Sequence, residues 1–570
     1  MPEKLTSFDF DPEIDLELHN GIWGVDATHS IPPWTPMFGW FWTNYCSLGA
    51  EWALAKLSLP GNRSWDMRYK EGLGYYGWGV VYDEEEYTRR EAKFREVIRP
   101  FLAGERNGLD ELIPEMVSHY ERLKQCDVDR VSDDDLFDHF EDCIRVNERM
   151  WKLHHFYMEL YYAVYLFFEN TCKELLGIDD AHPLFHQLLA GFDNKLFQID
   201  RRLWQLSKRA AELGLEDIFL KNADKEVVSK LESEDREEAR RWLSEFRQFL
   251  SEDGWRTGLR AEFIVPTWIE EPSPAISTIK MYLGKGGEFD LDEQRASAAK
   301  EREAAEREVL PKLSEEQRGA FVQLLRCAQV AGVYSESHNY YCEDYCYGLT
   351  RRCLMAIGRR YMKAGVLDKE EDILFLVPDE IRKTYWAKEC FTNLRKIVER
   401  RRKEWEGWTE KAIKGEFPPF ILAPGKTEQD IMPHLIRSGD GILLKTVIGS
   451  LPVPRPELKA DLQGVCGSPG VAKGRAVVCF TVADLPQIKK GDILVAPTTA
   501  PSWTPVFSLI GGAVVDRGGS LSHSAIVGRE YGIPVVINTF QGSAKIKTGD
   551  YIQIDANRGV VYIERKAGER

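Results

Sequence analysis

The sequence lacks any long apolar run. Its nearest approach, from Tyr161 to Phe168, is far shorter than the roughly 18 residues that predict a membrane-spanning helix, and it lies in a helical pattern. The N-terminal residues also lack the basic start and apolar stretch of a signal peptide. We therefore expect no membrane segment and a cytoplasmic location.

Basic residues are also fewer than acidic ones. The chain has 75 Lys and Arg against 91 Asp and Glu, a formal net charge of −16. A nucleic-acid binder needs a basic face. We therefore expect no nucleic-acid partner.

Cysteine spacing gives no disulfide framework, since the 11 cysteines are scattered along the chain. Residues His338, Cys342 and Cys346 recur at four-residue steps, so on one helix they would share a face and a metal ion is conceivable. No fourth ligand is visible, and scattered cysteines are usually thiols of the hydrophobic core. We predict no metal site.

The length of 570 residues exceeds what a single hydrophobic core supports, so we expect two to four domains. Residues 1 to about 130 are rich in tryptophan, which suits either a packed core or the wall of an apolar pocket. Three- and four-residue apolar spacing predicts a long helix from Asp133 to about Leu176. Further helical patterns follow, and the charged segment 290–309 is typical of an exposed helix or linker. We predict a large, mainly α-helical domain over residues 1–448, with a possible sub-boundary near 270–310.

The pattern changes near residue 450. Three prolines, Pro452, Pro454 and Pro456, predict a stiff, extended connection, and we place a hinge at 449–461. Beyond it, short β runs separated by glycines surround one helical pattern, SHSAIVGREY. The chain is thus predicted to be multidomain, with a small C-terminal α/β (β/β/α) domain at 462–566.

The segment that carries chemistry follows the run GGAVVD in this C-terminal domain. A glycine pair leads into His523, and a helix is expected to begin just after it. The N-terminus of a helix presents N–H groups and partial positive charge, which attract phosphate. An imidazole titrates near pH 6.5, so it is a good nucleophile at neutral pH. We expect His523 to be a nucleophile within an anion cradle made by Arg517, Gly518, Gly519, Ser520 and Ser522.

These residues resemble the swivelling phosphohistidine domain of PEP-utilising enzymes, a group that includes rifampicin phosphotransferase. That domain has a T-x-P-x-W-x-P-type turn, then G-G-x-x-x-H-x-A, then R-E-x-G-I-P. This chain supplies Thr499, Pro501, Trp503, Pro505 and Val506; Gly518, Gly519, His523 and Ala525; and Arg529, Glu530, Gly532, Ile533 and Pro534. The resemblance implies that His523 is the residue that becomes phosphorylated.

The region before residue 450 resembles the helical acceptor-substrate domain of rifampicin phosphotransferase. The similar segments are DATHSIPPWTPM from Asp26, WIEEPSPAISTIKMYL from Trp268, and the E-x-H segment at Glu336 with the Arg-containing helix after it. The candidate acceptor-binding residues are His29, His338, Arg351 and Arg352. The alternatives are a core histidine and a solvated arginine face.

An ATP-grasp domain and a PEP/pyruvate barrel, which such enzymes also use, have no counterpart in the sequence pattern. An acceptor domain plus a carrier domain resembles the larger subunit of two-component aryl phosphate synthases, of the phenylphosphate and 4-methylphenyl phosphate synthase type. The resemblance implies a separate ATP-grasp subunit that binds ATP, with Mg²⁺. The implied reaction is ATP + phenol + water → aryl phosphate + AMP + phosphate, with His523 as carrier and a small phenolic substrate such as phenol or 4-cresol as acceptor.

Two other functions remain open at this point. The acceptor could be another small, antibiotic-like alcohol. The chain could also be a phosphocarrier or regulatory subunit without catalytic activity, whose helical part binds a protein.

Overall fold

The computed structural model describes residues 9–27, 29–178, 182–257, 262–286, 290–438, 457–480, 482–499 and 503–568. The chain divides into two compact units. Unit 1 comprises Met1–Leu160, Ala261–Val265 and Tyr341–Gly441, and unit 2 comprises Tyr161–Arg260, Pro266–Tyr340 and Ile442–Arg570. Across the described ranges, no helix is both long and apolar enough to span a bilayer.

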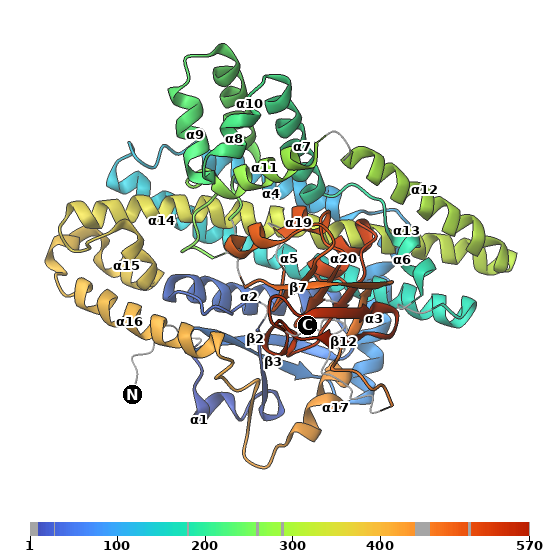
Figure 1. The fold of residues 1–570 in the computed structure, drawn as a ribbon. Coiled ribbons are helices and arrows are strands. Elements are labelled where there is room, and N and C mark those ends of the chain that lie inside the picture. Colours follow the sequence, from blue (N-terminus) through green and yellow to red (C-terminus); the bar gives the residue numbers. More distant parts are fainter. Residues whose placement is uncertain are drawn as a thin grey trace. The chain divides into compact units, whose positions relative to one another are not determined.

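Unit 1 is built on an antiparallel sheet with the strand order β2-β3-β1-β4, of which β2 and β3 are labelled in Figure 1. Its strands are β1 (Ile22–Val25), β2 (Asn62–Lys70), β3 (Leu73–Val80) and β4 (Phe420–Leu422). The first three come from the tryptophan-rich start of the chain, and β4 joins them from almost 400 residues further on. Six of the early tryptophans are buried, so this density serves a packed core: Trp23, Trp34, Trp40, Trp42, Trp65 and Trp78.

Helices make up most of unit 1. Helix α2 (Pro36–Leu57) begins at Thr35, whose hydroxyl accepts a hydrogen bond from the N–H of Phe38, and ends at Ser58 in the left-handed conformation. The other helices of this unit are α1 (Pro12–Asp15), α3 (Glu84–Leu102), α4 (Gly108–Lys124), α14 (Tyr345–Lys363), α15 (Pro378–Thr384), α16 (Leu394–Ile413) and α17 (Glu428–Ser438). Helix α5 (Asp133–Leu176) contributes residues to both units.

The helical part of unit 2 precedes the C-terminal module in the chain. It includes α6 (Pro183–Leu189), α7 (Lys195–Glu212), α8 (Glu216–Lys221), α9 (Asp224–Ser233), α10 (Glu237–Asp253), α11 (Ser273–Lys285), α12 (Leu291–Val309) and α13 (Glu315–His338). Helix α13 continues into η4 (Asn339–Asp344), a π-helical turn. Helices α7 to α11 pack on one another in a group that is drawn in green in Figure 1.

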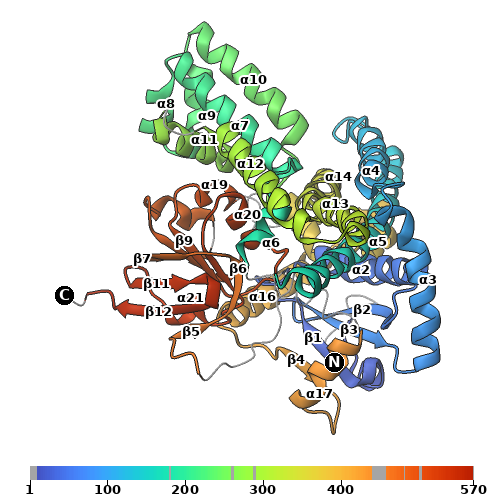
Figure 2. The same cartoon turned by 90° about the vertical axis from the view of Figure 1, so that its right-hand side faces the viewer.

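The C-terminal module contains an eight-stranded sheet of order β5-β12-β11-β7-β8-β9-β10-β6 (Figure 2). Its strands are β5 (Leu462–Gln463), β6 (Val465–Ser468), β7 (Val471–Val478), β8 (Ile493–Ala496), β9 (Gly512–Val515), β10 (Val535–Ile537), β11 (Tyr551–Asp555) and β12 (Val560–Arg565). The central strands β7 to β10 run parallel, and the outer pairs are antiparallel. In the part of the module that the structure describes, the sheet is accompanied by the short α-helices α19 (Thr504–Phe507), α20 (His523–Glu530) and α21 (Gly542–Lys545).

Alternation along the central strands gives this sheet two apolar faces. In β8, Leu494 and Ala496 pack into one core, and Ile493 and Val495 into the other. The first core includes side chains of α19 and α20, so α20 is fixed against the sheet. This packing sets where the first residue of α20 lies.

The predicted fold class is confirmed: a large helical region precedes a β-rich C-terminal domain. The helix predicted from Asp133 to Leu176 is confirmed as α5, and the charged segment 290–309 forms α12. The sheet of unit 1 has no counterpart among the predictions. The domain boundaries stay predictions, and all of the 449–461 hinge except 457–461 lies outside the described residues.

A close crossing of α2 and α5 in unit 1 yields a stability prediction. A Cβ on Gly49 would lie 2.6 Å from the main chain of Trp151, whereas one on Gly407 of α16 would meet nothing within 4 Å. We expect Gly49→Ala to lower the free energy of unfolding by about 1–3 kcal/mol through overpacking. The control Gly407→Ala should raise it by up to about 1 kcal/mol, because alanine favours helix. Chemical denaturation of both variants tests this, and equal effects would contradict the crossing.

Candidate active site

A rigid loop connects β9 to α20 in the C-terminal module. The Asp516 carboxylate accepts hydrogen bonds from the Thr539 hydroxyl (2.8 Å) and from the N–H of Ser543 (3.1 Å). Gly518 has φ +130°, and a Cβ there would lie 2.8 Å from Ser522 Oγ. This backbone angle and the tight space both require glycine, as the sequence predicted for a close approach before the helix.

The C-terminal turn of α20 also contacts this loop. Arg529 donates hydrogen bonds to the carbonyl oxygens of Gly467 (2.8 Å) and Ser520. Because Arg529 spans from the last turn of α20 to the loop before it, the position of the first turn is fixed relative to β6. The R-E-x-G-I-P segment therefore has a structural role at this site.

His523 is the first residue of α20, and its imidazole is buried. Nδ1 lies 3.2 Å from Glu336 Oε2, on α13 of the same unit. Nε2 lies 3.3 Å from Thr504 Oγ1, on α19. Since an ionised carboxylate only accepts hydrogen bonds, the contact with Glu336 favours a proton on Nδ1 and leaves Nε2 as the basic nitrogen.

Neither partner of the imidazole was predicted. Thr504 lies between Trp503 and Pro505 in the T-x-P-x-W-x-P-type turn, so its place in that motif was the available signal. Glu336 stands two residues before the candidate His338 in the E-x-H segment. Only the fold shows that this carboxylate, 187 residues away in sequence, reaches the ring.

The predicted cradle residues lie in the loop just before His523. Gly518 and Gly519 form its turn, Ser520 is buried, and Ser522 is the N-cap residue of α20. The Ser522 hydroxyl lies 3.3 Å from that of Ser524. The Arg517 guanidinium lies over the ring of Phe540 at 4.4 Å, and burial lowers its pKa. The first N–H groups of a helix lack intrahelical acceptors, so the start of α20 can bind an anion.

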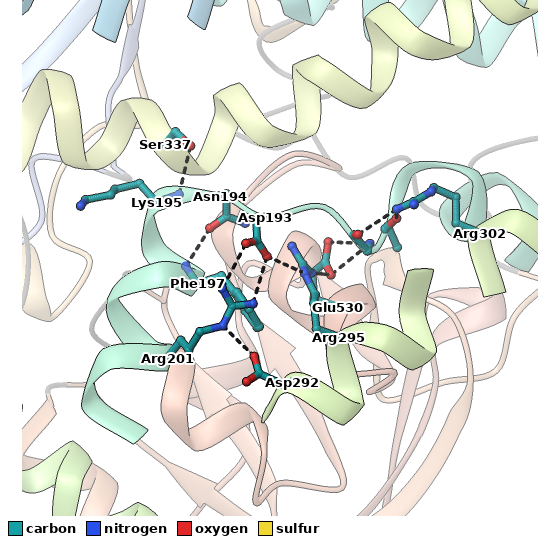
Figure 3. A network of polar contacts seen from close by, with 12 residues as sticks. Asp193, Asn194, Lys195, Phe197, Arg201, Asp292, Arg295, Arg302, Ser337 and Glu530 are labelled. Atoms are coloured by element: carbon teal, nitrogen blue, oxygen red, sulfur yellow. Dashed lines mark hydrogen bonds and ion pairs between the residues drawn. The ribbon is translucent and has the colours of Figure 1, made fainter. Parts of the chain in front are cut away.

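The helical part of unit 2 contacts α20 at both of its ends. At the start, the Ser335 hydroxyl donates to the carbonyl of Leu521 (3.1 Å), next to the Glu336–His523 contact. At the end, Glu530 pairs with Arg295 of α12 and accepts a hydrogen bond from the N–H of Gly191 (3.3 Å), as Figure 3 shows. We call the contacts of Glu530 with Arg295 and Gly191 the α20 latch.

A wider network supports the latch (Figure 3). Arg302 donates to the carbonyls of Ala190 and Gly191, which holds the 190–191 turn. Burial raises the pKa of Glu530, and the charge of Arg295 opposes that shift. A cavity of about 20 Å³ beside Glu530, lined by Leu521, Ile526 and helical residues that include Tyr165 and His186, has room for about one water molecule. The module is thus tightly packed on this wall.

Among the predicted acceptor-binding residues, His29 in unit 1 is partly exposed and contacts the buried carboxylate of Asp26. Its Nδ1 lies 2.9 Å from Asp26 Oδ2, and Tyr76 donates a short hydrogen bond to the same carboxylate. Burial alone would lower the pKa of His29, but the charge of Asp26, its hydrogen bond to the ring and the charge of Glu343 together outweigh burial and raise the pKa to about 8. The ring lies 5.1 Å from that of Trp42, within a dense group of aromatic side chains.

The other three candidates are engaged by their own units. Arg351 is buried and donates to the carbonyl of Phe263. Arg352 donates to the carbonyls of Leu123 (2.8 Å) and Cys126 (3.3 Å). In unit 2, His338 stacks on Tyr334, with ring centroids 4.9 Å apart, and its Nδ1 lies 3.0 Å from the Tyr334 carbonyl. All three side chains therefore help to hold main-chain segments in place.

Two models of known protein families match this chain, one in the helical region and one in the C-terminal module. A family model named rifampicin phosphotransferase fourth domain matches residues 153–336, and one named PEP-utilising enzyme, mobile domain, matches residues 488–559. These two parts of the chain are thus similar to a domain of rifampicin phosphotransferase and to the mobile domain of PEP-utilising enzymes. The matched ranges contain Glu336 and His523, the two residues whose side chains meet.

Three relatives show how far the similarity extends. The chain is 28% identical over 389 residues to the uncharacterized phosphotransferase YvkC of Bacillus subtilis (68% of this chain, 44% of that protein). It is 27% identical over 325 residues to rifampicin phosphotransferase of a Streptomyces species (56% and 34%). It is 42% identical over 106 residues to a probable phosphoenolpyruvate synthase of Pyrococcus abyssi (19% and 13%). The chain thus spans less than half the length of each of these proteins.

The α20 latch predicts how the module can be loosened. Arg295→Ala would leave the Glu530 carboxylate buried without its guanidinium partner, which typically costs about 3–5 kcal/mol. We expect hydrogen exchange to accelerate at least tenfold at amides of residues 523–531 and 189–193. Arg307→Ala is the matched control, because Arg307 lies on the same helix with a side chain that is 70% exposed. Unchanged exchange in Arg295→Ala would show that the latch does not hold the module.

The pair of Asp26 and His29 predicts a pH dependence of stability. Because the pKa of His29 is raised to about 8, its stabilisation is complete below about pH 6.5 and is lost as the pH rises through 8. His29→Gln should therefore lower the free energy of unfolding by about 1 kcal/mol at pH 6.5, a value reduced for water screening because the side chain is 32% exposed. Chemical denaturation should show this difference vanishing by pH 9. A constant difference from pH 6 to 9 would refute the pairing.

Proposed function

We propose that this chain is the phosphotransferase component of an enzyme that phosphorylates a small aromatic alcohol of the phenol class. His523 carries a phosphoryl group derived from ATP and transfers it to the hydroxyl of the acceptor. The observation that carries the proposal is the buried imidazole at the start of α20, with Glu336 on one nitrogen and Thr504 on the other.

The contact with Glu336 supports Nε2 as the atom that carries the phosphoryl group. A proton held on Nδ1 by the carboxylate leaves the lone pair of Nε2 for attack on phosphorus. Thr504 Oγ1, at 3.3 Å, then lies beside the phosphorylated nitrogen, where it can donate a hydrogen bond to a phosphoryl oxygen. Partial positive charge at the helix start offsets the charge of the phosphoryl group.

Glu336 also keeps the imidazole in the tautomer that the transfer requires. In the transfer step the acceptor oxygen bonds to phosphorus in line with the P–Nε2 bond, that bond breaks with its electron pair returning to Nε2, and the hydroxyl proton passes to solvent. The carboxylate stays beside Nδ1, on the other side of the ring from the reacting phosphorus, so it acts as a positioning residue.

An aromatic acceptor is supported by the helical wall around Glu336. Tyr334 stacks on His338 and lies 5.2 Å from the ring of Tyr161. Tyr162 OH lies 3.5 Å from the hydroxyl of Ser335. Planar side chains of this kind suit a flat, mostly apolar ring that carries one polar group.

ATP is expected from a separate ATP-grasp subunit, and Mg²⁺ is expected with it. Octahedral Mg²⁺ binds through carboxylates together with substrate phosphates. Near His523 the described carboxylates are Glu336, which contacts the ring, and Asp516, which is engaged by Thr539 and Ser543. These residues do not form a Mg²⁺ site, so the proposal has the ion arrive with ATP and assigns it no step on this chain.

An exchange reaction tests the proposal without the ATP-binding subunit. Phosphoryl transfer is reversible, so the purified chain should exchange phosphoryl between phenyl phosphate and isotopically labelled phenol. His523→Ala should reduce the exchange to the level seen without protein. Glu336→Gln should also slow it, because a neutral amide holds the proton on Nδ1 less firmly than a carboxylate does.

Control variants distinguish the carrier role of His523 from the identity of the acceptor. Glu316→Gln, an exposed carboxylate on the same helix as Glu336, should exchange at the wild-type rate. Exchange retained by His523→Ala would eliminate the phosphohistidine. An acid-labile phosphoryl on His523, formed with ATP and its binding subunit but transferred to no phenol, would keep the carrier and refute the acceptor. It would then favour an antibiotic-like alcohol or a phosphocarrier role.

A further inference from the structure

Two helices of unit 1 meet along a seam that contains thiols and an imidazole. On α5, His139, Cys143 and Asn147 follow at four-residue steps and so share one face. Asn147 Nδ2 donates to Thr350 Oγ1 of α14 at 2.8 Å, which fixes the register of the two helices. One turn after Thr350 on α14, Cys353 lies beside His139 and Cys143. All of these side chains are buried.

The ligand atoms of His139, Cys143 and Cys353 are close enough to share one ion. They all lie within 4.8 Å of one another, and His139 Nε2 is 3.8 Å from Cys143 Sγ. With metal–sulfur and metal–nitrogen bonds of about 2.3 and 2.0–2.1 Å, a sulfur and a nitrogen ligand of one ion at a trigonal angle stand about 3.7–3.8 Å apart. The pair of His139 and Cys143 already has this spacing, and the Cys353 sulfur lies within 4.8 Å of both ligand atoms.

The donor set selects a thiophilic ion. Thiolate sulfur and imidazole nitrogen suit Zn²⁺ and Cu⁺, whereas Mg²⁺ and Ca²⁺ prefer oxygen ligands. A bound ion would displace the thiol protons of both cysteines to solvent.

We propose that His139, Cys143 and Cys353 form a binding site for one thiophilic metal ion, Zn²⁺ or Cu⁺, which joins α5 to α14. Three-coordinate Cu⁺ needs no further ligand, whereas Zn²⁺ takes a fourth. The trio differs from His338, Cys342 and Cys346, which the sequence spacing suggested. Since α14 also carries Arg351 and Arg352, the ion would stiffen the helix that holds the segments at Phe263 and at Leu123–Cys126.

Metal titration of the full chain tests this site. Chain that has been stripped with a chelator under reducing conditions is titrated anaerobically with Cu⁺, and separately with Co²⁺ as a spectroscopic probe for Zn²⁺. We expect one equivalent of either ion, with thiolate-to-cobalt charge-transfer bands in the second case. Cys143→Ser and Cys353→Ser should each weaken binding at least 100-fold, whereas Cys172→Ser, a buried cysteine on the same helix, should not.

Several outcomes would overturn the site. Wild-type chain that binds neither ion at one equivalent refutes it, whether or not the variants fold. Binding that persists in both serine variants places the ion elsewhere. Binding of Cu⁺ without Co²⁺ bands would support the site and identify it as a three-coordinate one. The melting temperature of the wild-type chain should rise on metal binding, and that of Cys353→Ser should not.

Discussion

The account of this protein depends on one buried contact, between the imidazole of His523 and the carboxylate of Glu336. It connects the first residue of α20 to α13, and it sets which ring nitrogen carries the proton. A hydrogen bond to a charged group contributes about 1.5–3 kcal/mol, more than a neutral one. Leaving either partner buried without the other would cost more. The contact therefore favours one docked arrangement of the module within unit 2.

Helix α20 is held at both ends. At its start are Glu336 and Ser335, and at its end are Arg295 and the main chain of Gly191. Apolar side chains of the helical part also line the small cavity beside Glu530, so polar and apolar contacts together fix the position of this helix.

Local patterns predicted much of the fold. The alternation of the C-terminal β runs and the long apolar period of α5 are properties of neighbouring residues, and both were found where the sequence placed them. The sheet of unit 1 could not be predicted in the same way, because β4 pairs with β1 across almost 400 residues. Helix α20 begins at His523, one residue before the predicted start, which places the ring in its first turn.

The candidate site also has a part that the sequence predicted and a part that only the structure shows. The glycines, the serines and His523 form one continuous segment, so the sequence was enough to gather them. Glu336 and Thr504 come from other elements, and only the packing of α13 and α19 brings them to the ring. The most direct test is NMR of the phosphorylated, ¹⁵N-histidine-labelled chain, which identifies the nitrogen that bears phosphorus. The account predicts phosphorus on Nε2 of His523; phosphorus on Nδ1, or on another residue, would contradict it.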